Sequence, residues 1–256
     1  MPLNPPLASF AGRRIWIIGA STGIGAALAQ QLAARGARLA LSARSRDKLV
    51  GVAGAGDALV LPLDVTDLAS VHAAARELMA RWNGVDLALV VAGTHAELRA
   101  QTWDLAQARA LFEVNLHGVL NCVDAVLPTL LAQRAGGIGI VASVAGYIGL
   151  PRALAYGASK AALINFCESL YGDLRPLGIA TYLINPGFVD TPLTARNDFR
   201  MPALISADAA ARETLAGIAA GRFEIHYPRR FTRWLKLLRI LPYRLQFAAV
   251  RRLTNT

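Results

Sequence analysis

Tyr156 and Lys160 stand four positions apart in the segment 156–160. On a helix this spacing places both side chains on one face. A tyrosine hydroxyl, with an ordinary pKa of about 10, is a poor acid or base at neutral pH, but a neighbouring ammonium group stabilises its phenolate form. The pair can therefore form a tuned proton donor. Two unrelated surface residues would show the same spacing, so the surrounding segments must decide between these interpretations.

A glycine-rich turn at residues 19–25 follows a predicted strand at 14–18 and precedes an alanine- and leucine-rich helix that ends near Gly36. Glycines allow a tight turn and a close approach of the backbone to a phosphate, and the free amides at the helix start attract negative charge. The glycines could serve the turn alone, but the order strand, turn, helix favours a dinucleotide site. The candidate contacts in this turn are Gly19, Ser21, Thr22, Gly23, Ile24 and Gly25.

Arg44 follows the next predicted strand, residues 39–43, at the place where an acidic residue would bind the ribose hydroxyls of NAD. An arginine there would pair with the 2′-phosphate of NADP. Arg46 and Lys48 lie close by, and a solvated loop arginine would give the same pattern. We therefore expect NADP(H) to be favoured, with NAD(H) as the alternative.

Predicted strands continue at residues 58–63, 86–91, 138–142, 180–184 and 223–227, with helical segments between them. This alternation is typical of a parallel sheet. We predict one α/β domain of the Rossmann type, doubly wound, with about seven parallel strands and helices on both faces, over residues 1–228. Within it, residues 1–12 form an N-terminal arm and residues 188–206 a substrate loop. Residues 229–256 are expected to form a basic amphipathic helical tail.

Residues 12–192 resemble the short-chain dehydrogenase/reductase family. The resemblance rests on several motifs in the family's order: the glycine turn, Asp64, Ala92-Gly93, Asn115, Ser143 thirteen residues before Tyr156, Lys160, and Pro186-Gly187. The family usually has two asparagines directly before Ala-Gly, but Val90 and Val91 stand there in this chain. We expect this departure to alter cofactor contact and to leave the chemistry intact.

The resemblance implies an NAD(P)(H)-dependent oxidoreductase that interconverts a ketone and a secondary alcohol. Tyr156 would act as general acid or base, and Ser143 would hydrogen-bond the same substrate oxygen. Lys160 would bind the nicotinamide ribose and lower the pKa of Tyr156, and Asn115 would hold a water that links Lys160 to solvent. It also implies a homodimer or homotetramer. The cofactor contacts expected beyond the turn are Arg44, Asp64, Val65, Ala92, Gly93, Tyr156, Lys160, Pro186, Gly187, Val189 and Thr191.

An apolar wall for the substrate is expected at the carboxyl ends of the fourth to sixth strands, formed by Tyr147, Ile148, Leu150, Phe188 and Leu193, with His95 and Arg152 as polar contacts. This wall favours a lipophilic ketone or alcohol, although such residues could also pack under a loop or in a dimer contact. The alternative function is a catalytically weak NADP-binding sensor or scaffold protein, which could be associated with a membrane. The Val90-Val91 departure is the feature that favours this alternative.

The net charge of +10 is concentrated in residues 222–256, which hold nine basic residues and one acidic residue. The rest of the chain is nearly neutral, so we expect no nucleic-acid partner. At helical spacing the tail segregates its side chains: Phe231, Trp234, Leu235, Leu238 and Leu241 fall on one side, and Arg229, Arg233 and Lys236 opposite. A second apolar segment with Tyr243, Leu245, Phe247, Val250 and Leu253 follows a break at Pro242. The tail could touch an anionic membrane, a partner subunit or its own domain.

The two cysteines, Cys122 and Cys167, lie in apolar segments typical of buried free thiols, which favours a reduced, cytoplasmic compartment, with peripheral membrane contact left open. The four histidines show no ligand-like spacing, so we predict no metal site. The apolar runs are too short for a predicted membrane span, and we predict no signal peptide.

Overall fold

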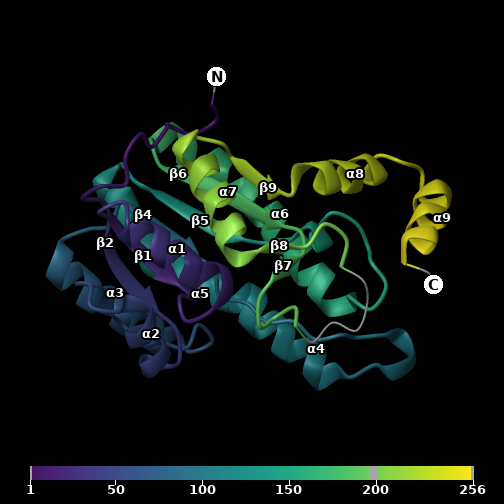
Figure 1. Ribbon diagram of the computed structural model, residues 1–256, viewed down its shortest axis with the longest axis horizontal. Coiled ribbons are helices and arrows are strands. Elements are labelled where there is room, and N and C mark those ends of the chain that lie inside the picture. The colour runs from purple at the N-terminus through teal and green to yellow at the C-terminus, as the bar shows by residue number, and fades with distance from the viewer. Residues whose placement is uncertain (1, 196–200, 255–256) are drawn as a thin grey trace.

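A seven-stranded parallel sheet forms the centre of the computed structural model, which describes residues 2–195 and 201–254 (Figure 1). The spatial order is β3-β2-β1-β4-β5-β6-β9. Its strands are β1 (Arg14–Ile18), β2 (Arg38–Ser42), β3 (Leu59–Val60), β4 (Leu87–Val90), β5 (Gly137–Val141), β6 (Ala180–Pro186) and β9 (Glu224–Tyr227). The chain starts in the middle of the sheet, winds outward to β3 and returns through β4, which makes the β1–β4 boundary a topological switch point. The predicted fold class and all seven predicted strands are confirmed.

Helices cover both faces of the sheet (Figure 1). Residues of α1 (Gly23–Ala33), α2 (Arg46–Ala53) and α7 (Ala207–Ala219) pack on one face, and residues of α3 (Leu68–Trp82), α5 (Gly118–Gln133) and α6 (Leu154–Leu174) pack on the other. In β1, Ile15 and Ile17 face the first group, while Trp16 and Ile18 face the second. Because both faces are buried, most of the strands are apolar runs without a polar face, whereas β9 alternates half-buried Glu224 and His226 with buried Ile225 and Tyr227.

A π-helical segment, Glu113–His117, joins α4 (Leu105–Phe112) to α5. It carries the fully buried Asn115, and such widened turns often mark functional sites. The whole stretch Leu105–Gln133 is long and apolar enough to cross a membrane by length and composition alone. In this fold α5 packs its apolar side chains, Val119 and Val126 among them, into the core between α3 and the sheet, so we interpret it as a core helix.

The substrate loop contains a short parallel pair that the sequence did not predict, β7 (Val189–Asp190) with β8 (Ile205–Ser206). Residues 196–200 of the expected loop lie outside the described residues. The N-terminal arm is tied to the domain by Asn4, which is buried and whose Nδ2 donates to the carbonyl oxygen of Thr181 at 2.8 Å. Cys122 and Cys167 are both buried free thiols, as predicted.

The tail forms two helices, α8 (Arg229–Arg239) and α9 (Tyr243–Thr254), separated at the predicted proline break. Leu235 and Leu238 join the core on the α6 side of the sheet. Trp234 and Leu241, expected on the same apolar stripe, are instead exposed, at 68% and 36%. Phe231 lies partly buried at its edge.

Candidate active site

Tyr156 and Lys160 lie one turn apart on α6 and meet Ser143 at the carboxyl end of β5. The Lys160 Nζ atom lies 5.9 Å from the centre of the Tyr156 ring and donates to the carbonyl oxygen of Val141 at 3.0 Å. Ser143 is buried, its Oγ accepts from the amide of Ala145 at 3.1 Å, and it is hydrogen-bonded to the Tyr156 hydroxyl. The three candidate catalytic side chains therefore converge at one place.

Asn115 fixes the loop after β4 beside this group. Its Oδ1 accepts from the amide of Thr94 at 2.7 Å, and its Nδ2 donates to the Thr94 carbonyl oxygen at 2.9 Å. A Cβ placed on Gly93 would lie 3.3 Å from Asn115 Oδ1 and 3.5 Å from Lys160 Nζ. The side chain of Asn115 is therefore used to position this loop, and its expected role in holding a water stays a prediction.

Burial dominates the electrostatics of the pair, because it penalises the charged form of both residues. It raises the pKa of Tyr156, an effect that the hydrogen bond from Ser143 only partly offsets. It lowers the pKa of Lys160 to about 8. The resemblance implied that Lys160 lowers the pKa of Tyr156, whereas in the protein alone the phenol is held protonated at neutral pH.

The glycine turn has the geometry of a phosphate-binding loop. Gly19 has φ +99°, and a Cβ there would lie 2.4 Å from the amide nitrogen of Ala92. A Cβ on Gly25 would lie 2.1 Å from the carbonyl oxygen of Gly19, so this glycine serves the contact between turn and helix. The side chain of Thr22, the residue before α1, makes no capping hydrogen bond. Amides at the start of α1 thus stay open to an anion.

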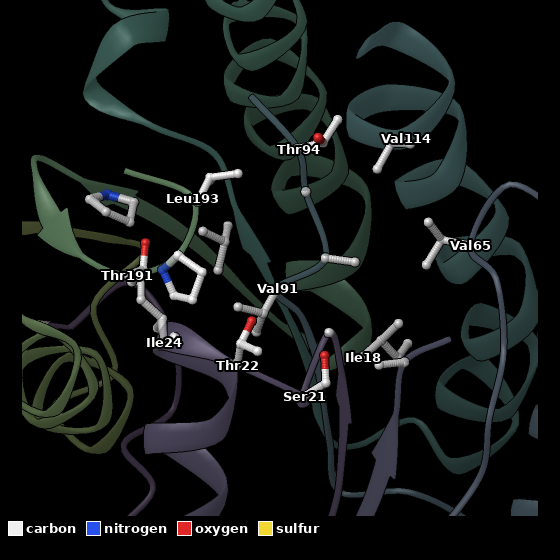
Figure 2. A pocket seen from close by; sticks show the side chains of 18 of the residues that line it. Ile18, Ser21, Thr22, Ile24, Val65, Val91, Thr94, Val114, Thr191 and Leu193 are labelled. Atoms are coloured by element: carbon white, nitrogen blue, oxygen red, sulfur yellow. The ribbon is translucent and has the colours of Figure 1, made fainter. Parts of the chain in front are cut away.

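A pocket of about 490 Å³ connects this turn with the Tyr156 group. Figure 2 shows Ser21 and Thr22 at its base, Thr191 and Leu193 on one side, and Val65 and Val114 on the opposite side. The predicted site residues that line the pocket are Gly19, Ser21, Thr22, Gly23, Ile24, Arg44, Asp64, Val65, Ala92, Gly93, Ser143, Tyr156, Lys160, Pro186, Gly187, Val189 and Thr191. Gly25 and Asn115 are adjacent without lining it.

Arg44 and Lys48 bring positive charge to the end of the pocket beyond β2. Asp64 lies there too, and its Oδ1 accepts from both the amide and the hydroxyl of Thr66, at 2.9 and 2.8 Å. These bonds, with a smaller contribution from Arg44, lower the pKa of Asp64. Asp64 is thus a turn residue and a pocket residue at once. The glycine turn, the open amides and the basic end together fit the phosphate groups of a dinucleotide.

Most residues of the predicted substrate wall do not line the pocket. Leu193 lines the pocket, but the hydroxyl of Tyr147 donates to Glu224 Oε1 at 2.5 Å on the side of β9 and α8, away from it. Phe188 packs against Phe231 of the tail, with ring centres 5.9 Å apart. Ile148 and Leu150 belong to the core, and Arg152 forms an ion pair with Glu97. Of the predicted apolar wall, only Leu193 lines the pocket, and a substrate contact by the other members stays a prediction.

His95, predicted as a polar substrate contact, does not line the pocket but lies directly against Tyr156. Its ring meets the Tyr156 ring edge-on at 4.7 Å, and burial lowers the pKa of His95. A neutral imidazole thus stands next to the candidate proton donor.

Several pocket residues were missed by sequence reasoning: Ile18, Ala43, Ser45, Lys48, Leu63, Thr66, Val91, Thr94, Val114, Val141, Ala142, Pro192 and Thr194. Most directly adjoin a predicted contact at the carboxyl end of a strand, and this adjacency is the signal that would have found them. Val114 is different, because it reaches the pocket through the π-helical segment.

Fold and site together define a dinucleotide-binding protein with a serine, tyrosine and lysine group at the carboxyl edge of its sheet. The family model for the short chain dehydrogenase matches residues 13–200. The chain belongs to this family of oxidoreductases.

Individual relatives agree with this assignment. An uncharacterized oxidoreductase of Myxococcus xanthus is 35% identical over 96% of this chain and 100% of its own length. A short chain dehydrogenase of Burkholderia cenocepacia, solved in complex with NADP, is 26% identical with a TM-score of 0.84, over 94% of this chain and 98% of that one. A short chain dehydrogenase/reductase of Burkholderia phymatum, solved with NAD, is 27% identical with a TM-score of 0.82, over 90% and 94% of the two chains.

Proposed function

We propose that this protein is an NADP(H)-preferring oxidoreductase that interconverts a ketone and a secondary alcohol on a lipophilic substrate. The observation that carries the proposal is the convergence of Ser143, Tyr156 and Lys160 on one wall of a pocket whose other end is the glycine turn. A similar protein with NADP and another with NAD support a nicotinamide cofactor. The preference for NADP rests on Arg44 and Lys48 at the basic end of the pocket.

When bound, the nicotinamide cofactor supplies hydride to the substrate carbon or accepts it from there. Tyr156 donates a proton to the carbonyl oxygen in the reductive direction, and burial keeps its hydroxyl protonated for that step. Ser143 hydrogen-bonds the same oxygen and stabilises the charge that develops there. Lys160 stays protonated at neutral pH and would hold the ribose hydroxyls of the cofactor, while Asn115 keeps the Gly93–Thr94 loop in place.

Replacing Tyr156 by phenylalanine tests the proposal. We expect Tyr156→Phe to bind NADPH as tightly as the wild type, measured by fluorescence titration, and to lose turnover, measured by NADPH and NADH oxidation over aliphatic, aromatic, steroidal and acyl ketones. Tyr147→Phe is the matched control, because its hydroxyl faces Glu224 and lies outside the pocket, and it should keep its turnover. Comparable rates for Tyr156→Phe and the wild type would refute the assignment.

The second candidate is a catalytically weak NADP-binding sensor or scaffold. Val91 favours it, since this residue lines the pocket where the family's asparagine would supply hydrogen bonds. Tight NADPH binding without turnover of any ketone in the panel would select it.

We also propose a cytoplasmic location, supported by the two buried free thiols, and a homodimer or homotetramer, supported by the family resemblance. Light scattering of the purified chain measures the second point.

A further inference from the structure

The tail is held in a fixed orientation on the domain. Leu235 and Leu238 are buried, and Lys236 forms an ion pair with Glu224 of β9. Thr232 is fully buried, and its hydroxyl is hydrogen-bonded to His226 Nδ1 at 2.5 Å. Because this inner face of α8 is anchored by both apolar and polar contacts, the opposite face is held outward.

The second tail helix is attached to the first. Gln246 is buried, and its Nε2 donates to the carbonyl oxygen of Leu238 at 2.9 Å. Val250 is buried as well. These contacts fix the inner side of α9 and leave Tyr243, Leu245 and Phe247 exposed.

Large apolar side chains dominate the outer side of the tail. Trp234 is 68% exposed, Ile240 77% and Tyr243 74%. The full set, called here the outer tail surface, is Trp234, Leu237, Ile240, Leu241, Tyr243, Leu245 and Phe247. Scattered single apolar residues on a surface need no explanation, but seven within fourteen positions indicate a surface that is covered by something.

Exposed arginines flank the outer tail surface. They are Arg229, Arg230, Arg233, Arg239, Arg244, Arg251 and Arg252, and residues 229–256 contain no aspartate or glutamate. On the α8 helix Arg230 and Arg233 fall between Trp234, Leu237 and Ile240 by their spacing. The outward side thus carries apolar and basic side chains together, where a packing face would carry apolar ones alone.

We propose that the outer tail surface docks on a lipid bilayer that contains anionic lipids. Tryptophan, tyrosine and phenylalanine suit the boundary between headgroups and acyl chains, and arginines beside them attract anionic headgroups. A nucleic acid would be held by the arginines but would leave the leucines and the isoleucine in water. A second copy of the chain would bring seven arginines against seven others, which opposes pairing.

The docked tail lies at the edge of the sheet that carries the active site. α8 begins directly after the carboxyl end of β9, and Figure 1 shows both tail helices extending from the side of the molecule where β7 and β8 lie. Phe231 packs on Phe188 and stands next to Gly187, which lines the pocket. Docking therefore places the α8 side of the pocket rim towards the bilayer. Delivery of a lipophilic substrate from the bilayer to the pocket would rest on the proposed function, whereas the docking proposal is independent of it.

Vesicle co-sedimentation of the full chain tests the proposal, with vesicles of phosphatidylcholine alone and of phosphatidylcholine with phosphatidylserine. We expect binding to the second kind only, weakened by salt. The variant Trp234→Ser, Leu237→Ser, Phe247→Ser should lose binding. Arg230→Gln with Arg233→Gln should weaken it by roughly fivefold per arginine removed. All five positions are exposed, so folding should be preserved, and circular dichroism verifies this.

Matched controls separate docking from general charge or stickiness. Leu68→Ser and Arg76→Gln remove one exposed apolar and one exposed basic side chain from α3 and should bind vesicles as the wild type does. Tyr156→Phe should also bind normally, so a failed enzyme assignment and failed docking give different results.

Three outcomes would overturn the proposal. In the first, the wild type stays in the supernatant with both kinds of vesicle. In the second, the serine variant still binds, which would leave only attraction by charge. In the third, the wild type binds neither kind of vesicle and the serine variant forms a smaller oligomer than the wild type, which would make the outer tail surface an interface between copies of the chain.

Discussion

Replacing Lys160 by methionine should stabilise the cofactor-free protein at neutral pH while removing its activity. Lys160 is 3% exposed, and burial lowers its pKa from 10.5 to about 8. At pH 7 the buried ammonium therefore costs about 3 kcal/mol relative to the unfolded chain. Methionine has a similar shape without the charge, but it leaves the carbonyl oxygen of Val141 without its donor, a loss of about 1 kcal/mol. The expected net gain in the free energy of unfolding is about 2 kcal/mol.

The gain should depend on pH in a defined direction. The pKa of Lys160 is lower in the folded protein than in the unfolded chain, so the unfolded chain binds more protons between pH 8 and 10.5. The stability of the wild type contributed by this group consequently rises with pH across that window, whereas the methionine variant has no such group. The advantage of the variant should shrink to less than about 0.5 kcal/mol near pH 9.5.

Urea denaturation of both proteins at neutral pH and near pH 9.5 measures the two differences. Lys48→Met is the matched control, because Lys48 is exposed, and its change should stay within about 0.5 kcal/mol at both pH values. The reasoning is refuted if Lys160→Met is less stable than the wild type at neutral pH. It is refuted equally if the difference between them is the same at both pH values.

Three further outcomes are expected. Arg44→Ala should raise the KM for NADPH by about 5- to 30-fold and leave the KM for NADH nearly unchanged, since one exposed charge-assisted contact contributes about 1–2 kcal/mol. Arg46 lies outside the pocket lining, so Arg46→Ala should change neither KM. Equal increases in KM for both cofactors would contradict the role of Arg44. Gly25→Ala should lower the free energy of unfolding by about 1–3 kcal/mol, because the added Cβ would clash with the Gly19 carbonyl oxygen. Gly172 of α6 has open space around it, so Gly172→Ala should raise the melting temperature slightly. Equal melting temperatures for the two variants would contradict this contrast. Ketone reduction should fall above pH about 8 as Lys160 loses its proton, and a rate that stays flat to pH 10 would contradict this.

The fold was predictable because its signals are local. Most strands are short apolar runs buried on both faces, and they are followed by turn or helix signals such as Asp67, whose Oδ1 accepts from the amides of Ala69 and Ser70 at the start of α3. The pair β7 and β8 lacked such a signal, because each strand is two residues long and its only strand partner among the described residues is the other.

The site was predictable where the residue types carry the chemistry, and unpredictable where the direction in which a side chain points decides its partner. Tyr147 lies four residues after Ser143, yet its side chain turns to Glu224, a partner 77 positions away that no local pattern indicates. Spacing put Lys160 near Tyr156 correctly, but it carries no information on burial. The pKa values of both groups depend on what surrounds them in three dimensions.

Burial acts on both members of the Tyr156 and Lys160 pair by favouring their neutral forms, and the consequences differ for the two directions of reaction. For reduction, a protonated phenol is the form that the step consumes, and the raised pKa of Tyr156 supplies it throughout the neutral range. For oxidation, the phenolate is required, and burial opposes it until the pH is high or a positive charge is brought into the pocket. The pKa of Lys160 near 8 limits how much charge the protein itself provides there as the pH rises. At neutral pH the protein's own groups therefore supply the protonated phenol that the proposed reduction would consume.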